Sequence, residues 1–422
     1  MKITIHRGTN QIGGCVTEIE SGGYKVFIDF GEQLPGSNNH DLDPIEGLSC
    51  GDVSKSALFI THYHGDHIGK ISETVNELKI YAGESNKEIY KCLLERLSET
   101  RPDKYKNILS RIKEIRSFKE FDQITIGGIT VTPLWADHSA FDAYMFIIEA
   151  QGKRILHTGD FRGHGFRSHE LESMLKEYAQ NIDYIITEGT NIQQPNVIMK
   201  TEMELQSEFE SQFREIKYNF VLVSSTNIDR IFALYHAAKN AKRCFVCDNY
   251  QANIMKFVSQ NHENPLYDID YKQKTEQSGR FFTLSKEYNQ PFTFDGKLKP
   301  YLERHGFVMI FRANNQFKTL VEKYSVTNDF KIYYSMWDGY LDSSEPAYSE
   351  SMYKFLEPYQ FKHVHTSGHA DVQTLNTVFT IVKPKYGVIP IHTEAPERFR
   401  ELFKDQKIIL LKDGEKLDNN EN

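Results

Sequence analysis

Residues 57–67 read Ala57-Leu58-Phe59-Ile60-Thr61-His62-Tyr63-His64-Gly65-Asp66-His67, an apolar run that leads directly into three histidines and an aspartate. The apolar run predicts a buried strand, and Gly65 relaxes the turn that follows it. Imidazole nitrogens and a carboxylate oxygen leaving one strand end together are ligands suited to zinc or a similar divalent ion. The alternative is a polar surface loop with chance histidines, but a cluster this dense has no packing purpose.

The spacing within this cluster indicates two adjacent metal ions rather than one. His62 and His64 alternate, so their side chains can share one side of the loop, whereas Asp66 and His67 fall on another. The remaining ligands must then come from other parts of the chain.

Length and composition predict a folded protein with more than one domain. A chain of 422 residues exceeds the usual size of a single hydrophobic core, so two domains are expected. No apolar run approaches the length needed to span a bilayer, so no membrane partner is expected. The first six residues alternate like a strand and lack the apolar core of a signal peptide, which predicts a cytoplasmic protein.

Cysteine content and charge exclude two further classes. Five cysteines, an odd number in a large chain, do not form a disulfide framework. Cys244 and Cys247 form a single Cys-x-x-Cys motif in a strand-like run. A single motif of this kind favours buried thiols over a metal site. A net charge of −8 argues against coating nucleic acid by bulk electrostatics, although a local basic channel stays open.

Several other strand-like runs also lead to residues that ligate metals or transfer protons. The runs near 129–135, 154–156, 184–187 and 386–391 lead to His138, Asp160, Glu188 and His392. Polar residues at successive strand ends assemble a site along one edge of an α/β or αββα sandwich. Asp29 also ends a strand-like run, and it reads equally well as a turn cap or as a carboxylate that orients a histidine.

The middle of the chain has a different pattern of apolar residues. Helical spacing at 203–215 and 228–239 alternates with strand-like runs at 221–223, 244–248, 307–311 and 331–335. This alternation predicts a second domain with a small parallel sheet. Residues 267–289 are polar and poorly patterned, which predicts an irregular segment.

These motifs, in this order, resemble the β-CASP branch of the metallo-β-lactamase superfamily, whose members include ribonuclease J and the messenger-RNA cleavage endonucleases. The matching residues are His62-x-His64-x-Asp66-His67, His138, Asp160, Thr187-Glu188-Gly189-Thr190, Ser367-Gly368-His369-Ala370 and Ile391-His392-Thr393-Glu394. Ser224-Ser225-Thr226-Asn227-Ile228-Asp229-Arg230 further resembles the phosphate-contacting turn of that branch. The resemblance spans nearly the whole chain.

The resemblance implies an α/β fold, a metallo-β-lactamase αββα sandwich interrupted by an inserted β-CASP domain. Residues 1–195 and 365–422 would form the sandwich, and residues 196–364 the insertion. Two divalent ions are implied, zinc first and manganese second. One ion would take His62, His64 and His138, the other Asp66, His67 and His392, with Asp160 bridging them.

Catalytic and substrate-binding roles also follow from the resemblance. The implied catalytic residues are Asp66, His369, Glu188 and Asp29, and the implied substrate contacts are Ser224, Ser225, Thr226, Asn227, Ser367, Gly368 and Ala370. His369 would bind or protonate the phosphate region, and the alternative is a structural histidine that orients Glu188. The chain departs from ribonuclease J at Thr226 and Asp229, where serine and histidine are usual, and it shows no counterpart of the further C-terminal domain of ribonuclease J.

The predicted function is metal-dependent hydrolysis of single-stranded RNA. Neutral imidazoles and two aspartates leave a metal pair with net positive charge, which favours an anionic phosphodiester over a neutral substrate. A nuclease for single-stranded DNA and a non-catalytic subunit are the alternatives. Every ligand position is filled, which argues against the inactive subunit. The sequence leaves open whether the protein forms a homodimer.

Overall fold

The computed structural model describes residues 1–37, 41–270, 280–286, 290–294 and 296–418. The chain divides into two compact units. The first unit is Met1–Met199 with Gly368–Asn422, and the second is Lys200–Ser367. The chain therefore leaves the first unit, forms the second, and returns. Within the described residues, no helix has the length and apolar character to cross a membrane.

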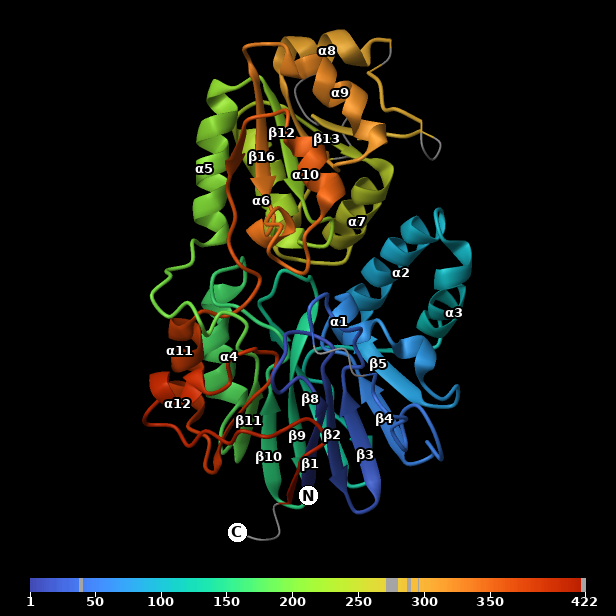
Figure 1. Cartoon of the computed structure of the whole chain (residues 1–422), viewed down its shortest axis with the longest axis vertical. Helices are drawn as coiled ribbons and strands as arrows, with labels where there is room; N and C mark the ends of the chain where they lie inside the picture. Colours follow the sequence, from blue (N-terminus) through green and yellow to red (C-terminus); the bar gives the residue numbers. More distant parts are fainter. Residues whose placement is uncertain (38–40, 271–279, 287–289, 295, 419–422) are drawn as a thin grey trace. The chain divides into compact units, whose positions relative to one another are not determined.

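Two sheets form the centre of the first unit (Figure 1). The first sheet has the order β19-β1-β2-β3-β4-β5-β6, formed by Lys416–Asp418, Lys2–Arg7, Val16–Ser21, Tyr24–Ile28, Ser56–Phe59, Lys79–Gly83 and Arg116–Phe118. The second has the order β18-β11-β10-β9-β8-β7, formed by Gly387–Pro390, Tyr184–Thr187, Lys153–His157, Ala143–Ala150, Ile129–Ala136 and Ile124–Ile126. Because β18 pairs in parallel with β11, the returning segment completes this sheet.

One hydrophobic core joins the two sheets. Ile3, Ile28 and Phe59 of the first sheet are fully buried in one cluster with Met145 and Leu156 of the second. The same cluster takes in apolar residues of α4 (Leu171–Tyr178) and α11 (Val372–Val382), while α2 (Glu84–Ser98) contacts β5 and α3 (Pro102–Ile112) packs on α2. The αββα sandwich predicted from the sequence is therefore confirmed.

The second unit is built on one parallel sheet with the order β14-β13-β15-β12-β16-β17. Its strands are Phe281–Leu284, Cys244–Asp248, Phe307–Phe311, Tyr218–Val223, Phe330–Ser335 and Phe361–His363. Its helices are α5 (Glu202–Glu215), α6 (Ile228–Asn240), α7 (Asn249–Gln260), α8 (Leu298–His305), α9 (Asn315–Ser325) and α10 (Glu350–Leu356). Cys244 and Cys247 are free, buried thiols inside β13, as predicted.

The neighbouring strands β12 and β15 form a topological switch point in this sheet. The chain leaves β12 through α6 toward β13 on one side, and leaves β15 through α9 toward β16 on the other side. Right-handed crossovers in opposite directions place the two helices on opposite faces of the sheet. Loops that follow such strands diverge, which leaves room for a ligand at their carboxyl ends.

Two local predictions were wrong. Residues 267–289 were expected to be irregular, but they contain β14, which pairs in parallel with β13; residues 271–279 and 287–289 lie outside the described part of the chain. The metal motif was expected to form a loop, yet Gly65–Ile68 forms the one-turn helix α1. Gly31 permits this turn because a Cβ there would stand 1.6 Å from the Asp66 carbonyl oxygen.

Candidate metal centre

The side chains predicted to bind metal converge at one edge of the sandwich of the first unit. Five strands lead to these side chains, and the carboxyl ends of the strands lie at this edge (Figure 1). They are β4, β8, β10, β11 and β18. His62 and His64 lie in the turn after β4, and Asp66 and His67 in α1. His392 Nε2 lies 3.2 Å from Asp66 Oδ2. The centre therefore brings together segments that are more than 300 residues apart in sequence.

His62, His64 and His138 form the first group of ligand atoms, which all lie within 4.8 Å of one another. His64 Nδ1 is 3.0 Å from His62 Nε2 and 3.3 Å from His138 Nε2. Burial lowers the pKa of His64 to about 4 and holds the pKa values of His62 and His138 well below their usual range. The three imidazoles are therefore neutral at pH 7 and offer lone pairs to a cation.

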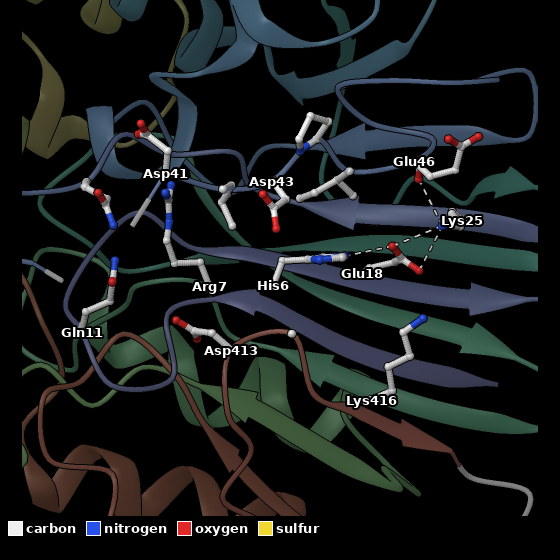
Figure 2. Close-up of a pocket in the computed structure, with 15 residues that line it drawn as sticks. His6, Arg7, Gln11, Glu18, Lys25, Asp41, Asp43, Glu46, Asp413 and Lys416 are labelled. Atoms are coloured by element: carbon white, nitrogen blue, oxygen red, sulfur yellow. Dashed lines mark hydrogen bonds and ion pairs between the residues drawn. The ribbon is translucent and has the colours of Figure 1, made fainter. Parts of the chain in front are cut away.

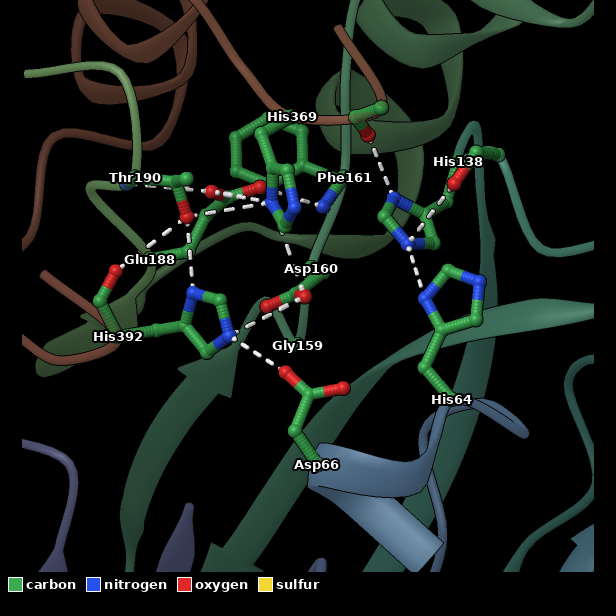
Figure 3. A network of polar contacts seen from close by, with 12 residues as sticks. His64, Asp66, His138, Gly159, Asp160, Phe161, Glu188, Thr190, His369 and His392 are labelled. Carbon is green, nitrogen blue, oxygen red and sulfur yellow. Dashed lines mark hydrogen bonds and ion pairs between the residues drawn. The ribbon is translucent and has the colours of Figure 1, made fainter. Parts of the chain in front are cut away.

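Asp66, His67, Asp160 and His392 form the second group. His67 Nε2 lies 3.1 Å and His392 Nε2 lies 3.5 Å from Asp160 Oδ2 (Figure 3 shows Asp66, Asp160 and His392). The same carboxylate oxygen is 3.9 Å from His62 Nε2 of the first group. Asp160 therefore lies between the two groups.

This donor set fits divalent metal ions. The buried His67 Nε2 has no hydrogen-bond partner among the described residues, although two carboxylates face it. A buried polar atom without a partner costs free energy, and a cation between these donors removes that cost. Nitrogen and oxygen ligands in this mixture suit zinc, with manganese as the harder alternative. The chain therefore presents a divalent metal centre.

Each of three ligand histidines is oriented by a partner outside the centre. His67 Nδ1 lies 2.7 Å from Asp29 Oδ2, and His138 Nδ1 lies 2.6 Å from the Gly368 carbonyl oxygen. Thr190 Oγ1 lies 2.8 Å from His392 Nδ1. Such partners engage Nδ1 and leave Nε2 for the metal. Asp29 does more than cap a turn, although its Oδ1 also accepts a hydrogen bond of 2.7 Å from the Thr61 amide.

We expect Asp29→Asn to weaken zinc affinity by about 10- to 100-fold, because the neutral amide no longer holds His67 by a charged hydrogen bond. Competition of the purified protein with a chromophoric chelator measures this. Asp52→Asn is the matched control and should bind zinc normally, because the carboxylate of this surface aspartate accepts from the Ser54 amide and hydroxyl in its own turn. Normal affinity in Asp29→Asn would show that Asp29 serves only as a turn cap.

His369 stands beside the centre with an acid of its own. His369 Nδ1 is 3.0 Å from Glu188 Oε2 and 3.7 Å from Asp160 Oδ2 (Figure 3). Burial opposes the charged imidazole, but attraction by Glu188 and Asp160 outweighs it and raises the pKa of His369 to about 9. Glu188 is itself held by the Phe161 amide, which donates to its Oε1 at 2.8 Å. Asp160, Glu188, His369 and His392 form a third group with the spacing of metal ligands.

The predicted substrate contacts fall in both units. Gly368 holds His138, as described, and the Ala370 amide donates to Glu188 Oε1 at 3.4 Å, so both residues support the centre through their backbones. Ser367 ends the second unit. The turn Ser224–Asn227 joins β12 to α6 in the second unit, where Ser224 Oγ lies 2.9 Å from Thr226 Oγ1 and the Asn227 side chain caps α6.

The sequence did not reveal a buried ion pair behind the centre. Asp137 Oδ1 accepts from Arg162 Nε at 3.3 Å, and Asp137 Oδ2 accepts from the Gly165 amide at 2.7 Å. Asp137 precedes His138 and Arg162 follows Asp160 by two positions, so the pair ties two ligand-bearing segments together. One sequence feature could have indicated this ion pair: each of these two predicted ligands has a charged residue within two positions, at the end of an otherwise apolar strand. Thr190 belongs to a motif recognised in the sequence, but its contact with His392 was not predicted.

A pocket of about 520 Å³ lies apart from the metal ligands in the first unit (Figure 2). His6, Glu18 and Lys25 line it from β1, β2 and β3, and Asp413 and Lys416 from the returning segment. Ile3 and Ile5 alternate with His6 along β1 and point into the core, so the pocket opens on the outer face of the first sheet. None of the predicted metal ligands lines it.

Comparison with known proteins agrees with this geometry. Residues 34–215 match the family described as beta-lactamase superfamily domain, and residues 359–410 match the Zn-dependent metallo-hydrolase RNA specificity domain. The chain is 22% identical to ribonuclease J of Mycoplasma genitalium over 417 residues, which cover 93% of this chain and 68% of that protein. It is 21% identical to ribonuclease J of Helicobacter pylori strain 26695, covering 99% and 60%.

A eukaryotic relative and a solved structure are also similar. Cleavage and polyadenylation specificity factor 73 of Drosophila melanogaster is 25% identical over 279 residues, which are 61% of this chain and 36% of that protein. A crystal structure of a protein of unknown function from Enterococcus faecalis V583 superposes with a TM-score of 0.70 at 19% identity, covering 99% of both chains. The latter likeness shows the fold alone.

The family resemblance inferred from the sequence is thus confirmed by both domain matches and by relatives that align along almost the whole chain. The chain therefore carries a beta-lactamase superfamily domain and a Zn-dependent metallo-hydrolase RNA specificity domain, and along nearly its whole length it resembles the ribonuclease J-like proteins of the β-CASP branch.

Proposed function

We propose that this protein is a metal-dependent nuclease that hydrolyses phosphodiester bonds of single-stranded RNA. The observation that carries the proposal is the convergence of two ligand groups on Asp160, with the protonated His369 beside them. The relatives named ribonuclease J and the match to an RNA specificity domain support RNA as the substrate.

The proposed centre would hold two divalent ions, zinc as the first choice and manganese as the second. His62, His64 and His138 would hold one ion, and Asp66, His67 and His392 the other, with Asp160 bridging them. Such an ion pair lowers the pKa of a water to about 7 and offsets negative charge developing on a phosphoryl oxygen.

The chain itself supplies positioning and a proton. Asp29, Gly368 and Thr190 hold the ligand histidines in the tautomer that faces the centre. Glu188 keeps His369 charged and directs its ring, and His369 donates its proton to the leaving oxygen. The alternative in which His369 merely orients Glu188 is disfavoured, because Glu188 is already held by the Phe161 amide.

Residues of the second unit are proposed to hold the RNA as the β-CASP insertion. The turn Ser224–Asn227 places three hydroxyl groups between a strand end and a helix start, which suits a phosphate. Ser367 would contact the same substrate beside His369. We assign the protein to the cytoplasm, because its five cysteines are free thiols and reduced thiols persist there.

We expect His369→Ala to lower kcat by roughly 100- to 1,000-fold while KM changes by only a few-fold, because the lost proton donor acts in the transition state. Steady-state cleavage of a fluorescently labelled RNA measures both constants. His169→Ala, at a histidine whose side chain is 71% exposed, is the control and should behave like the unmodified protein. A rise in KM alone would assign His369 to substrate binding.

Incubation of the purified protein with end-labelled RNA and a matched DNA, under zinc or manganese, tests the whole proposal. RNA should be degraded faster than DNA, and a chelator should stop the reaction. The product ladder reports whether cleavage starts at an end or within the strand. Preferential cleavage of DNA would instead establish a single-strand DNA nuclease, and intact strands of both kinds would refute nuclease activity.

A further inference from the structure

An exposed tryptophan follows the strand next to the proposed phosphate turn in the second unit. β12 and β16 pair in parallel with Val223 opposite Ser335, so Ser224 and Trp337 lie one and two residues beyond a shared register. Neighbouring strands are about 4.8 Å apart. The two loops therefore start side by side at the carboxyl edge of the sheet, next to the switch point between β12 and β15.

The Trp337 ring is held in place although its side chain is 48% exposed. A Cβ on Gly339 would lie 2.3 Å from the ring, so only glycine allows the ring to rest on this backbone. Tyr340 adds an edge contact, with ring centroids 5.6 Å apart and an interplanar angle of 81°. The Tyr334 hydroxyl donates to the Trp337 carbonyl oxygen at 2.7 Å. An aromatic ring fixed in this way loses little entropy when it stacks on a ligand.

The charges near Trp337 determine which part of a nucleotide can bind beside this ring. Asp338, Asp342 and Glu345 follow it in sequence, and the Asp338 side chain is 70% exposed. These carboxylates repel phosphate groups but leave the uncharged face of a base unaffected. The neighbouring turn Ser224–Asn227 carries no carboxylate and has the hydroxyl groups of Ser224, Ser225 and Thr226 instead. The two loops thus complement the two halves of a nucleotide.

We propose that Trp337 stacks on a base of single-stranded RNA whose phosphate lies at the turn Ser224–Asn227. This inference rests on the proposed function and adds a base-binding position to it. Stacking on an aromatic ring tolerates every base, so the site contributes affinity without sequence preference.

The protein provides its own reporter for this contact. It has two tryptophans, and Trp135 is only 5% exposed with Arg167 over its ring at 4.1 Å. Quenching of fluorescence by an RNA base therefore reports Trp337. An Asp160→Asn background prevents cleavage during titration with a short oligoribonucleotide. A set of oligomers in which a single abasic ribose moves along the strand should lose quenching at one position.

Binding constants in the same background complete the test. Trp337→Ala should weaken RNA binding by about 10-fold, whereas Trp337→Phe should retain most of the affinity. The slope of log K against log salt should not change, because no phosphate contact is lost. Phe361→Ala is the matched control, because it also removes an exposed aromatic residue (38%) of the second unit. Phe361 is paired with Ile332, well before the end of β16 from which the Trp337 loop starts.

The outcomes separate this inference from the proposed function. Unquenched fluorescence, or equal affinity of Trp337→Ala and the control, in a protein that cleaves RNA would overturn the inference alone. Absence of RNA cleavage and binding by the unmodified protein would overturn the proposed function and the inference with it. A changed salt slope in Trp337→Ala would assign the loss to a phosphate contact and so contradict stacking.

Discussion

Asp160→Asn is expected to abolish RNA hydrolysis, with kcat lower by roughly 10,000-fold or more. Asp160 Oδ2 lies within 3.9 Å of ring nitrogens of His62, His67 and His392, so one oxygen serves both ligand groups. The amide keeps the shape of the side chain but removes the negative charge that would hold two cations side by side. The loss should therefore exceed the ~10–100-fold expected for an outer partner such as Asp29.

Cleavage of labelled RNA at saturating zinc or manganese measures this effect, and elemental analysis counts the bound ions. Asp183→Asn is the matched control. Asp183 is also buried and accepts from the Arg154 amide at 2.8 Å, but it precedes β11 and so lies at the opposite edge of the same sheet. Normal turnover in metal-saturated Asp160→Asn would refute the assignment of Asp160 as the bridge.

Arg230→Ala should cost about 3–5 kcal/mol of the free energy of unfolding, because it removes the bidentate arginine partner of a buried carboxylate. Arg230 Nε and Nη2 donate to Glu202 at 2.7 and 3.0 Å, and both side chains are 0% exposed. Arg230 also donates to Ser335 Oγ and to the Val364 carbonyl oxygen. One guanidinium thus joins α5, α6, β16 and the segment that leaves the second unit.

Urea unfolding followed by circular dichroism measures the loss. Arg214→Ala breaks an ion pair with Glu210 whose arginine is 56% exposed, and it should cost less than about 1 kcal/mol. The double variant Arg230→Met with Glu202→Leu should recover most of the stability, because it removes both charges together. Equal costs for Arg230→Ala and Arg214→Ala would show that the buried pair does not hold the second unit together.

Local sequence indicated where along the chain the predicted metal ligands lie. His62, His64, Asp66 and His67 are close in sequence, and each later ligand follows an apolar run long enough to be recognised as a strand. The period of apolar residues predicted a strand over the first six residues and a helix beginning at residue 228. The structure has β1 at Lys2–Arg7 and begins α6 at Ile228. Such signals depend only on neighbouring residues, which is why they can be read without a structure.

Strands that are buried on both faces were harder to predict. β9 (Ala143–Ala150) has no polar alternation, because it lies in the middle of the second sheet with nearly every residue buried. β14 was missed for a different reason: it is a short edge strand in a polar segment, and its pairing with β13 stabilises it. In both cases pairing with neighbouring strands stabilises the conformation, and that pairing is not visible in the local sequence.

Only the tertiary structure decided what the charged residues do. The local pattern left Asp29 open between a turn cap and a carboxylate that orients a histidine, and it gave no partner for Arg162 or Arg230. Each of the three is buried against a partner 25 or more positions away in sequence. The free energy of a charge depends on its solvation and on the partner that replaces water. Both are properties of the folded chain, because they arise only when distant segments pack together.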